Sequence, residues 1–171
     1  MLADSVPDTG GLYFVPAFVG TAAPHYDSFA RGTMFGITDE TNRGHIARAA
    51  LEAMAYQTRD AIESVSAHSG NSIDVIRADG GVARSDFLLQ FQSDILGIPV
   101  ERPDILDAAA MGAAYMAGLY VGFWDSVDEI SQLWRCQRRF EPQLTTGRRD
   151  ALYEGWSEAV NRAAGWREHK M

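Results

Sequence analysis

One long helical pattern constrains the fold of this chain more than any other feature. From His45 to about His68, apolar and small side chains recur every three to four residues, which is the spacing of one helix face. Charged side chains mostly take the other side, and Gly70 supplies a stop. We therefore expect a long amphipathic helix with its apolar face toward a core. The apolar positions are Ala47, Ala50, Leu51, Met54, Thr58, Ala61, Ile62 and Val65, and the charged ones are Arg48, Glu52, Arg59, Asp60 and Glu63.

Strand patterns flank this helix on both sides. Residues 12–19 are β-branched and aromatic, and Pro16 is expected to interrupt or end that strand. A second short strand is expected at 33–37, and a third at 73–78, where it ends in an Asp-Gly-Gly turn. Another helix should follow the glycines and lead to a strand at 99–102. Its apolar face comprises Phe87, Leu88, Phe91, Ile95 and Leu96.

Two more helices complete the alternation. Residues 107–120 are apolar and small nearly all round, which predicts a helix sandwiched tightly against the sheet. Near the C-terminus, Thr145 or Thr146 is expected to cap a last helix. The core positions of that helix are Leu152, Trp156, Ala159, Ala163 and Trp166. The whole pattern indicates an α/β fold in a single domain, which 171 residues can form.

Composition excludes several classes of function. The formal net charge of -8 argues against binding to nucleic acid or to an anionic membrane surface. Cys136 is the only cysteine, so no intrachain disulfide can form. The N-terminus lacks a signal pattern, and the longest apolar run, 108–121, is too short to span a membrane. We expect a cytoplasmic protein without membrane insertion.

The segment from Asp79 to Ser85 is the most suggestive chemically. Gly80 and Gly81 allow a ligand to approach the backbone, and the helix that follows offers unpaired N–H groups at its start. A glycine turn that only reverses the chain is the alternative. No P-loop, Gly-x-Gly-x-x-Gly or Gly-x-Ser-x-Gly motif is present, and the four histidines are too scattered to indicate a metal site.

A family resemblance rests on longer stretches. Gly32-Thr-Met-Phe-Gly-Ile37, a gap of seven residues and His45-Ile-Ala-Arg-Ala-Ala-Leu-Glu52 resemble the C-terminal signature of the FGGY carbohydrate kinases. Other runs resemble the glycerol kinases of that family, and the resemblance covers about residues 11–166. These runs include Val15-Pro-Ala-Phe18, Phe91-Gln-Ser-Asp-Ile-Leu-Gly97 and Val100-Glu-Arg-Pro103.

The resemblance implies an actin-like, ribonuclease-H-like ATPase fold, with a mixed sheet flanked by helices. In this family ATP lies in a cleft between two domains, and residues 1–171 resemble an incomplete C-terminal, nucleotide-binding domain. The turn matches the adenosine-binding motif of the family, which implies that Gly80 and Gly81 bind ATP together with its Mg²⁺. Ser85 stands where glycerol kinases usually have an asparagine, so it either contacts ATP or only caps a helix.

The resemblance also implies what the chain does not contain. The catalytic aspartate and the polyol-binding residues of the family belong to the N-terminal domain, so no catalytic residue is assigned here. We expect that the chain alone does not phosphorylate glycerol, and that its exposed cleft surface promotes homo-oligomers. Two alternatives stay open: a non-catalytic interaction or oligomerisation module with the same fold, or part of a kinase for another polyol or sugar.

Overall fold

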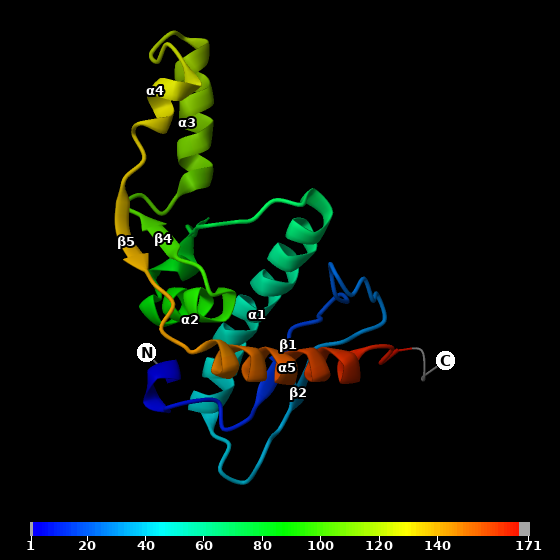
Figure 1. Cartoon of the computed structure of the whole chain (residues 1–171). Coiled ribbons are helices and arrows are strands. Elements are labelled where there is room, and N and C mark those ends of the chain that lie inside the picture. Colours follow the sequence, from blue (N-terminus) through cyan, green and yellow to red (C-terminus); the bar gives the residue numbers. More distant parts are fainter. Residues whose placement is uncertain (1, 168–171) are drawn as a thin grey trace.

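The computed structural model describes residues 2–167 and has a body with a projecting arm (Figure 1). The long helix α1 (Arg43–Ser69) and the last helix α5 (Thr146–Ala163) cross in the body, with α2 (Asp86–Leu96) beside them. The arm contains α3 (Ala108–Tyr120) and the short α4 (Val127–Ser131). Two 3₁₀ turns, η1 (Leu2–Ser5) and η2 (Gly81–Arg84), complete the helical elements.

The bounds of α1 follow from its caps. The Asn42 side chain accepts hydrogen bonds from the N–H groups of Gly44 and His45, and the His45 ring accepts one from the Asn42 N–H. This reciprocal capping box satisfies N–H groups that a helix start leaves unpaired. At the other end Gly70 adopts a left-handed conformation with φ 68°. The predicted long helix and its glycine stop are confirmed.

The predicted core face of α1 is wrong in part. The side of α1 that is most deeply buried carries Ala49, Glu52, Ala53, Tyr56 and Asp60, whereas Ala61 and Val65 are exposed. Two carboxylates can lie inside because each has partners: Arg48 pairs with Glu52, and the side chains of α5 donate to Asp60. Periodicity identified the apolar face that includes Ala61 and Val65, whereas the described residues of this chain cover the opposite face, which also carries charges.

The strands form two small sheets. β1 (Tyr13–Val15) ends directly before Pro16 and pairs antiparallel with β2 (Thr33–Phe35). The other sheet has the order β3-β4-β5, in which β3 (Ile76–Arg77) is parallel and β5 (Cys136–Phe140) antiparallel to β4 (Val100–Pro103). This sheet is mixed, as expected. β5 was not predicted, because four of its five residues are exposed and no alternation marks it.

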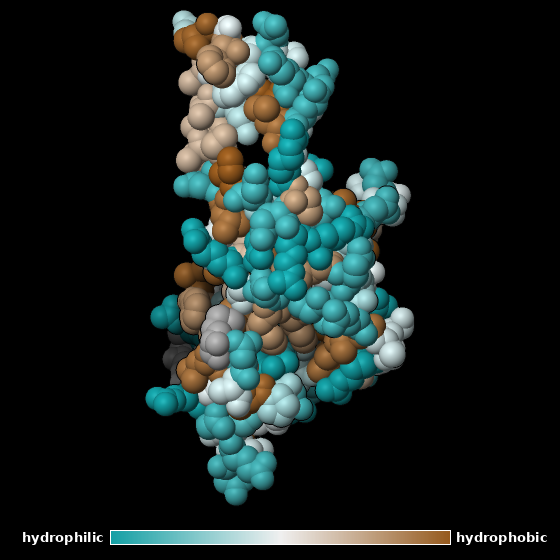
Figure 2. Space-filling view, turned by 90° about the vertical axis from the view of Figure 1, so that its left-hand side faces the viewer, coloured by the Kyte–Doolittle hydropathy of each residue, from teal (hydrophilic) through white to brown (hydrophobic). Residues whose placement is uncertain are grey.

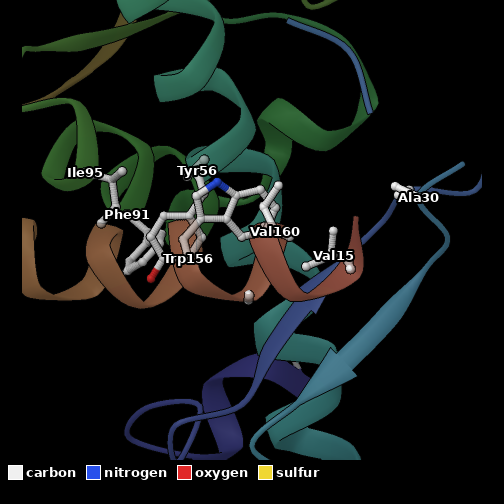
Figure 3. Packing of buried hydrophobic residues seen from close by; sticks show 12 residues of the cluster. Val15, Ala30, Tyr56, Phe91, Ile95, Trp156 and Val160 are labelled. Carbon is white, nitrogen blue, oxygen red and sulfur yellow. The ribbon is translucent and has the colours of Figure 1, made fainter. Parts of the chain in front are cut away.

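Aromatic side chains at the crossing of three helices form the main core (Figure 3). The Tyr56 ring of α1 stacks on Trp156 of α5 at a centroid distance of 5.4 Å and meets the edge of Phe91 of α2 at 5.5 Å. Such pairs add to the free energy that burial of their apolar area supplies. Thr145 caps α5, as one of the two expected caps. The predicted Trp166, in contrast, is about half exposed.

The helix at 107–120 forms as α3 but is not sandwiched against a sheet, which corrects the prediction. Only Gly118 of this helix is buried, where the Trp124 ring packs over it, while Met116 and Tyr120 are 65% and 92% exposed. The projecting arm in Figure 2 accordingly shows hydrophobic residues on its surface. Within residues 2–167, no helix is long and apolar enough to cross a membrane.

Candidate functional site at the Gly80–Gly81 turn

The predicted site residues come together in one turn between β3 and α2. Gly80 has φ 84° and ψ -179°, a backbone conformation that side chains with a Cβ rarely adopt. Its N–H donates to the Leu106 carbonyl at 2.8 Å, which ties the turn to the segment after β4. Gly81 then opens the 3₁₀ turn η2, and Ser85 joins η2 to α2.

Both glycines face open space. A Cβ placed on Gly80 or on Gly81 would meet no heavy atom within 4 Å. Close packing inside this chain therefore requires neither glycine. Backbone conformation favours glycine only at position 80, where φ is positive. The backbone of the turn is left accessible to a flat ligand, as the prediction requires.

Two hollows border the turn and share Asp79. One, of about 530 Å³, lies between α1 and α2 and is mostly apolar; on α1 it includes the partly buried Met54 and the exposed Ala61 and Val65. The other, of about 340 Å³, lies between the sheet and the arm. Each volume is in the range of small-molecule sites. Their lining residues besides Asp79 include Thr58, Ile62, Val82 and Leu88 in the first, and Arg77, Ile105, Met111, Tyr115 and Trp134 in the second.

Ser85 acts as a helix cap. Its Oγ accepts a hydrogen bond from the Leu88 N–H at 3.2 Å, which satisfies one of the unpaired groups at the start of α2. The hydroxyl proton of Ser85 remains free to donate, because an Oγ that accepts one bond can still donate another. The capping role is thus shown, and contact with a nucleotide stays a prediction.

Arg102 holds the turn in place, a role that sequence reasoning missed. Its Nη1 donates to the Ala83 carbonyl at 3.0 Å and to Asp86 Oδ1 at 2.7 Å, so β4 is joined to η2 and to the first residue of α2. Arg138 of β5 also pairs with Asp86. The signal was present in the Val100-Glu-Arg-Pro103 run, but no local spacing connects that run with the glycines.

Metal binding has no preformed site in the described part of the chain. Among residues 2–167, no group of three or more His, Cys, Asp or Glu side chains is arranged to hold an ion. Asp79 is exposed beside the turn, and its carboxylate forms no hydrogen bond or ion pair within the same residues.

The open glycine turn leads through η2 into the start of α2 beside a mixed sheet, and a helix start of this kind can bind an anionic group in an α/β domain. Residues 1–120 match the model of the C-terminal domain of the FGGY family of carbohydrate kinases, and the chain belongs to this family. The predicted family and fold class are thus confirmed.

Individual relatives are glycerol kinases. The chain is 55% identical to the glycerol kinase of Pseudothermotoga lettingae and 53% identical to glycerol kinase 2 of Thermotoga maritima, over 98% and 96% of its length. It covers only 34% and 33% of those proteins, so it spans about a third of the curated relatives it matches.

Solved structures agree with this placement. A crystal structure of Plasmodium falciparum glycerol kinase with ADP superposes with a TM-score of 0.83 at 35% identity, over 95% of this chain and 32% of that one. Xylulose kinase from Rhodospirillum rubrum gives a TM-score of 0.75 at 30% identity, over 94% and 32%. The fold is therefore shared across kinases that are named for different substrates.

Proposed function

We propose that residues 1–171 form the C-terminal, nucleotide-binding domain of an ATP-dependent glycerol kinase. The observation that carries the proposal is the open Gly80–Gly81 backbone beside two hollows, in a family of carbohydrate kinases. The adenosine of ATP or ADP lies against these two glycines, and Ser85 donates its free hydroxyl proton toward it. Mg²⁺ comes with the phosphates. The names of the similar curated relatives favour glycerol over other polyols or sugars.

The reaction needs the rest of such a kinase. Phosphoryl transfer depends on groups positioned from both sides of the phosphates, and this chain spans about a third of its relatives. The unpaired outer edge of β3 supports this part of the proposal. Ile76 and Ala78 donate their N–H groups toward β4, so the backbone groups of Arg77 point to the other edge of β3, where no described strand pairs. The whole enzyme acts in the cytoplasm.

Nucleotide binding is tested best with Gly81→Ala. A methyl group there occupies the space we assign to the nucleotide, yet it touches no protein atom, so the fold should be unaffected. We expect ATP and ADP, titrated by calorimetry with Mg²⁺, to bind at least about tenfold more weakly to the variant, which corresponds to ~1.4 kcal/mol. Gly147→Ala on α5, where a methyl group also meets open space, is the matched control.

Two results would reject this reading. Equal nucleotide affinity of Gly81→Ala and the unaltered chain would place the site elsewhere, and no binding at millimolar nucleotide would favour the interaction module. Catalysis is tested separately, by ADP release with chain, glycerol, ATP and Mg²⁺. We expect no turnover above background, and robust turnover would contradict the need for a second domain.

A further inference from the structure

Both ends of the glycine turn are tied to one neighbour, strand β4 with the segment after it. At the start of the turn, the Gly80 N–H donates to the Leu106 carbonyl at 2.8 Å. At its end, Arg102 Nη1 of β4 donates to the Ala83 carbonyl at 3.0 Å. Residues 81–82 lie between these two ties, and both are exposed. The part of the turn that is open to a ligand is therefore a short bridge whose two ends are held from the sheet side.

The guanidinium of Arg102 is fixed by partners on three elements. Besides the bond to η2, its Nη1 donates to Asp86 Oδ1 of α2 at 2.7 Å, and its Nε donates to Gln137 Oε1 of β5 at 2.7 Å. The side chain is 12% exposed, and the guanidinium lies 5.5 Å from the centroid of the Phe140 ring. Arg102 is therefore a rigid support, because a guanidinium with several acceptors in one plane has little freedom to move.

The turn itself is a weak structure. The Ala83 N–H donates to the Gly80 carbonyl at 3.2 Å, and the Ser85 N–H donates to the Val82 carbonyl at 3.0 Å. Bonds between residues three apart have poorer geometry than those of an α-helix. Glycine also loses more backbone freedom on ordering than other residues, which disfavours a single conformation. The contact from Arg102 should therefore decide how much of the time the turn keeps its conformation.

We propose that Arg102 is a positioning residue for the nucleotide. The inference rests on the proposed function, in which adenosine lies against Gly80 and Gly81. Arg102 lines neither of the two hollows beside the turn, so it acts through the turn rather than on the ligand. A ligand that binds one conformation loses affinity in proportion to the fraction of chains that leave it. Removal of Arg102 should weaken nucleotide binding although no contact with the nucleotide is lost.

This role differs from attraction of the phosphates by charge. A guanidinium that bound phosphate would strengthen the binding of ADP and leave that of adenosine unchanged. The charge of Arg102 is already paired with Asp86, and its bond to Ala83 acts on the part of the site assigned to adenosine. Adenosine and ADP should therefore lose affinity by the same factor when Arg102 is replaced.

The test is titration of the ¹⁵N-labelled full chain with adenosine and with ADP and Mg²⁺, followed by NMR. In Arg102→Met we expect both compounds to bind about tenfold more weakly, which is the result when about nine in ten chains leave the binding conformation. Arg102→Lys keeps the charge but cannot reach three acceptors at once, so its affinity should lie between the two. Arg139→Met is the matched control, since Arg139 of β5 pairs with Glu101 and Glu141 rather than with the turn. Its affinity should equal that of the unaltered chain.

A second measurement separates positioning from general stability. Amide hydrogen exchange at Ala83 and Ser85, whose N–H groups bond within the turn, should accelerate by roughly tenfold in Arg102→Met. The N–H of Ile95, which is fully buried in α2, reports on unfolding of the body and should change less. Equal acceleration at all three residues would show that Arg102 only stabilises the fold, and would overturn the proposal.

The binding results distinguish this inference from the proposed function. If the unaltered chain binds ADP and Arg102→Met binds it equally well, or if only ADP and not adenosine loses affinity, the positioning role is rejected and the nucleotide site stands. If the unaltered chain binds neither compound at millimolar concentration, the proposed function is rejected, and this inference with it.

Discussion

Asp60 connects three parts of the body, and its removal should destabilise the fold measurably. The carboxylate is 5% exposed and accepts hydrogen bonds from Tyr153 Oη at 2.5 Å and from Trp156 Nε1 at 2.9 Å, with His25 Nε2 at 3.5 Å. It therefore joins α1 to α5 and to the loop after β1. A hydrogen bond to a charged group contributes about 1.5–3 kcal/mol, and a buried donor left unpaired adds a penalty.

We expect Asp60→Ala to lower the free energy of unfolding by about 2–4 kcal/mol. The indole N–H of Trp156 loses the acceptor that it has in the core, whereas the Tyr153 hydroxyl keeps Glu63 at 3.3 Å and therefore loses less. With a urea m-value of about 2 kcal/mol/M, the midpoint should fall by about 1–2 M. Asp60→Asn retains one carbonyl acceptor and should lie between the two proteins.

Urea unfolding followed by tryptophan fluorescence and circular dichroism measures both variants at low protein concentration. Asp39→Ala is the matched control, because Asp39 is exposed before α1, and a surface change of this kind alters stability by less than about 0.5 kcal/mol. If Asp60→Ala unfolds within about 0.5 kcal/mol of the unaltered chain, the carboxylate does not hold the helices together and the reasoning fails.

Two further predictions concern a buried carboxylate and the bare arm. Burial raises the pKa of Glu52 from its ordinary 4.5 to about 7 against the opposing charge of Arg48, so the native state keeps a proton that the unfolded chain loses between these pH values. Stability should therefore fall by up to about 3 kcal/mol as pH rises through this window, and Glu52→Gln should flatten that slope in urea unfolding; equal slopes would contradict it. Met116→Lys should reduce self-association in sedimentation velocity, whereas Gln132→Lys, which adds the same charge at an exposed polar position of the arm, should not; identical distributions would refute a role for the apolar surface.

The sequence predicted elements with strong local signals well. The 3.6-residue period, the glycine stop at Gly70 and the cap at Thr145 are local signals, and α1, α2 and α5 form where these signals lie. Strand β5 has no apolar alternation, because it is an exposed edge whose only buried residue is Phe140. Which face of a helix is buried was harder to predict than the helix itself. Periodicity identified an apolar face of α1, but it did not show that Glu52 and Asp60 have partners that allow the opposite face to be buried.

Of the candidate site, the sequence predicted only the glycine turn and not the contacts that support it. Gly80 and Gly81 are adjacent in sequence, so their chemistry was visible there. Arg102 supports the turn from β4, and this contact depends on strand order rather than on spacing. Ser85 illustrates a third limit, because a serine before a helix suits a cap and a ligand contact equally well, and the structure shows only the cap.

The bare apolar surfaces meet where the nucleotide is proposed to bind. The hollow that contains the exposed α1 face and the hollow beneath the arm share Asp79, directly before the glycines. A polypeptide that covers these surfaces would thus also exclude water from the turn, and hydrogen bonds and charge interactions there would strengthen in the lower dielectric. This domain alone can offer backbone contacts to the nucleotide, but it does not exclude water from it. The chain should therefore bind ADP more weakly than a whole glycerol kinase of 50% or more identity does, such as those of Pseudothermotoga lettingae and Thermotoga maritima. Parallel calorimetric titrations measure the difference, and equal affinities would show that this domain forms the complete adenosine site by itself.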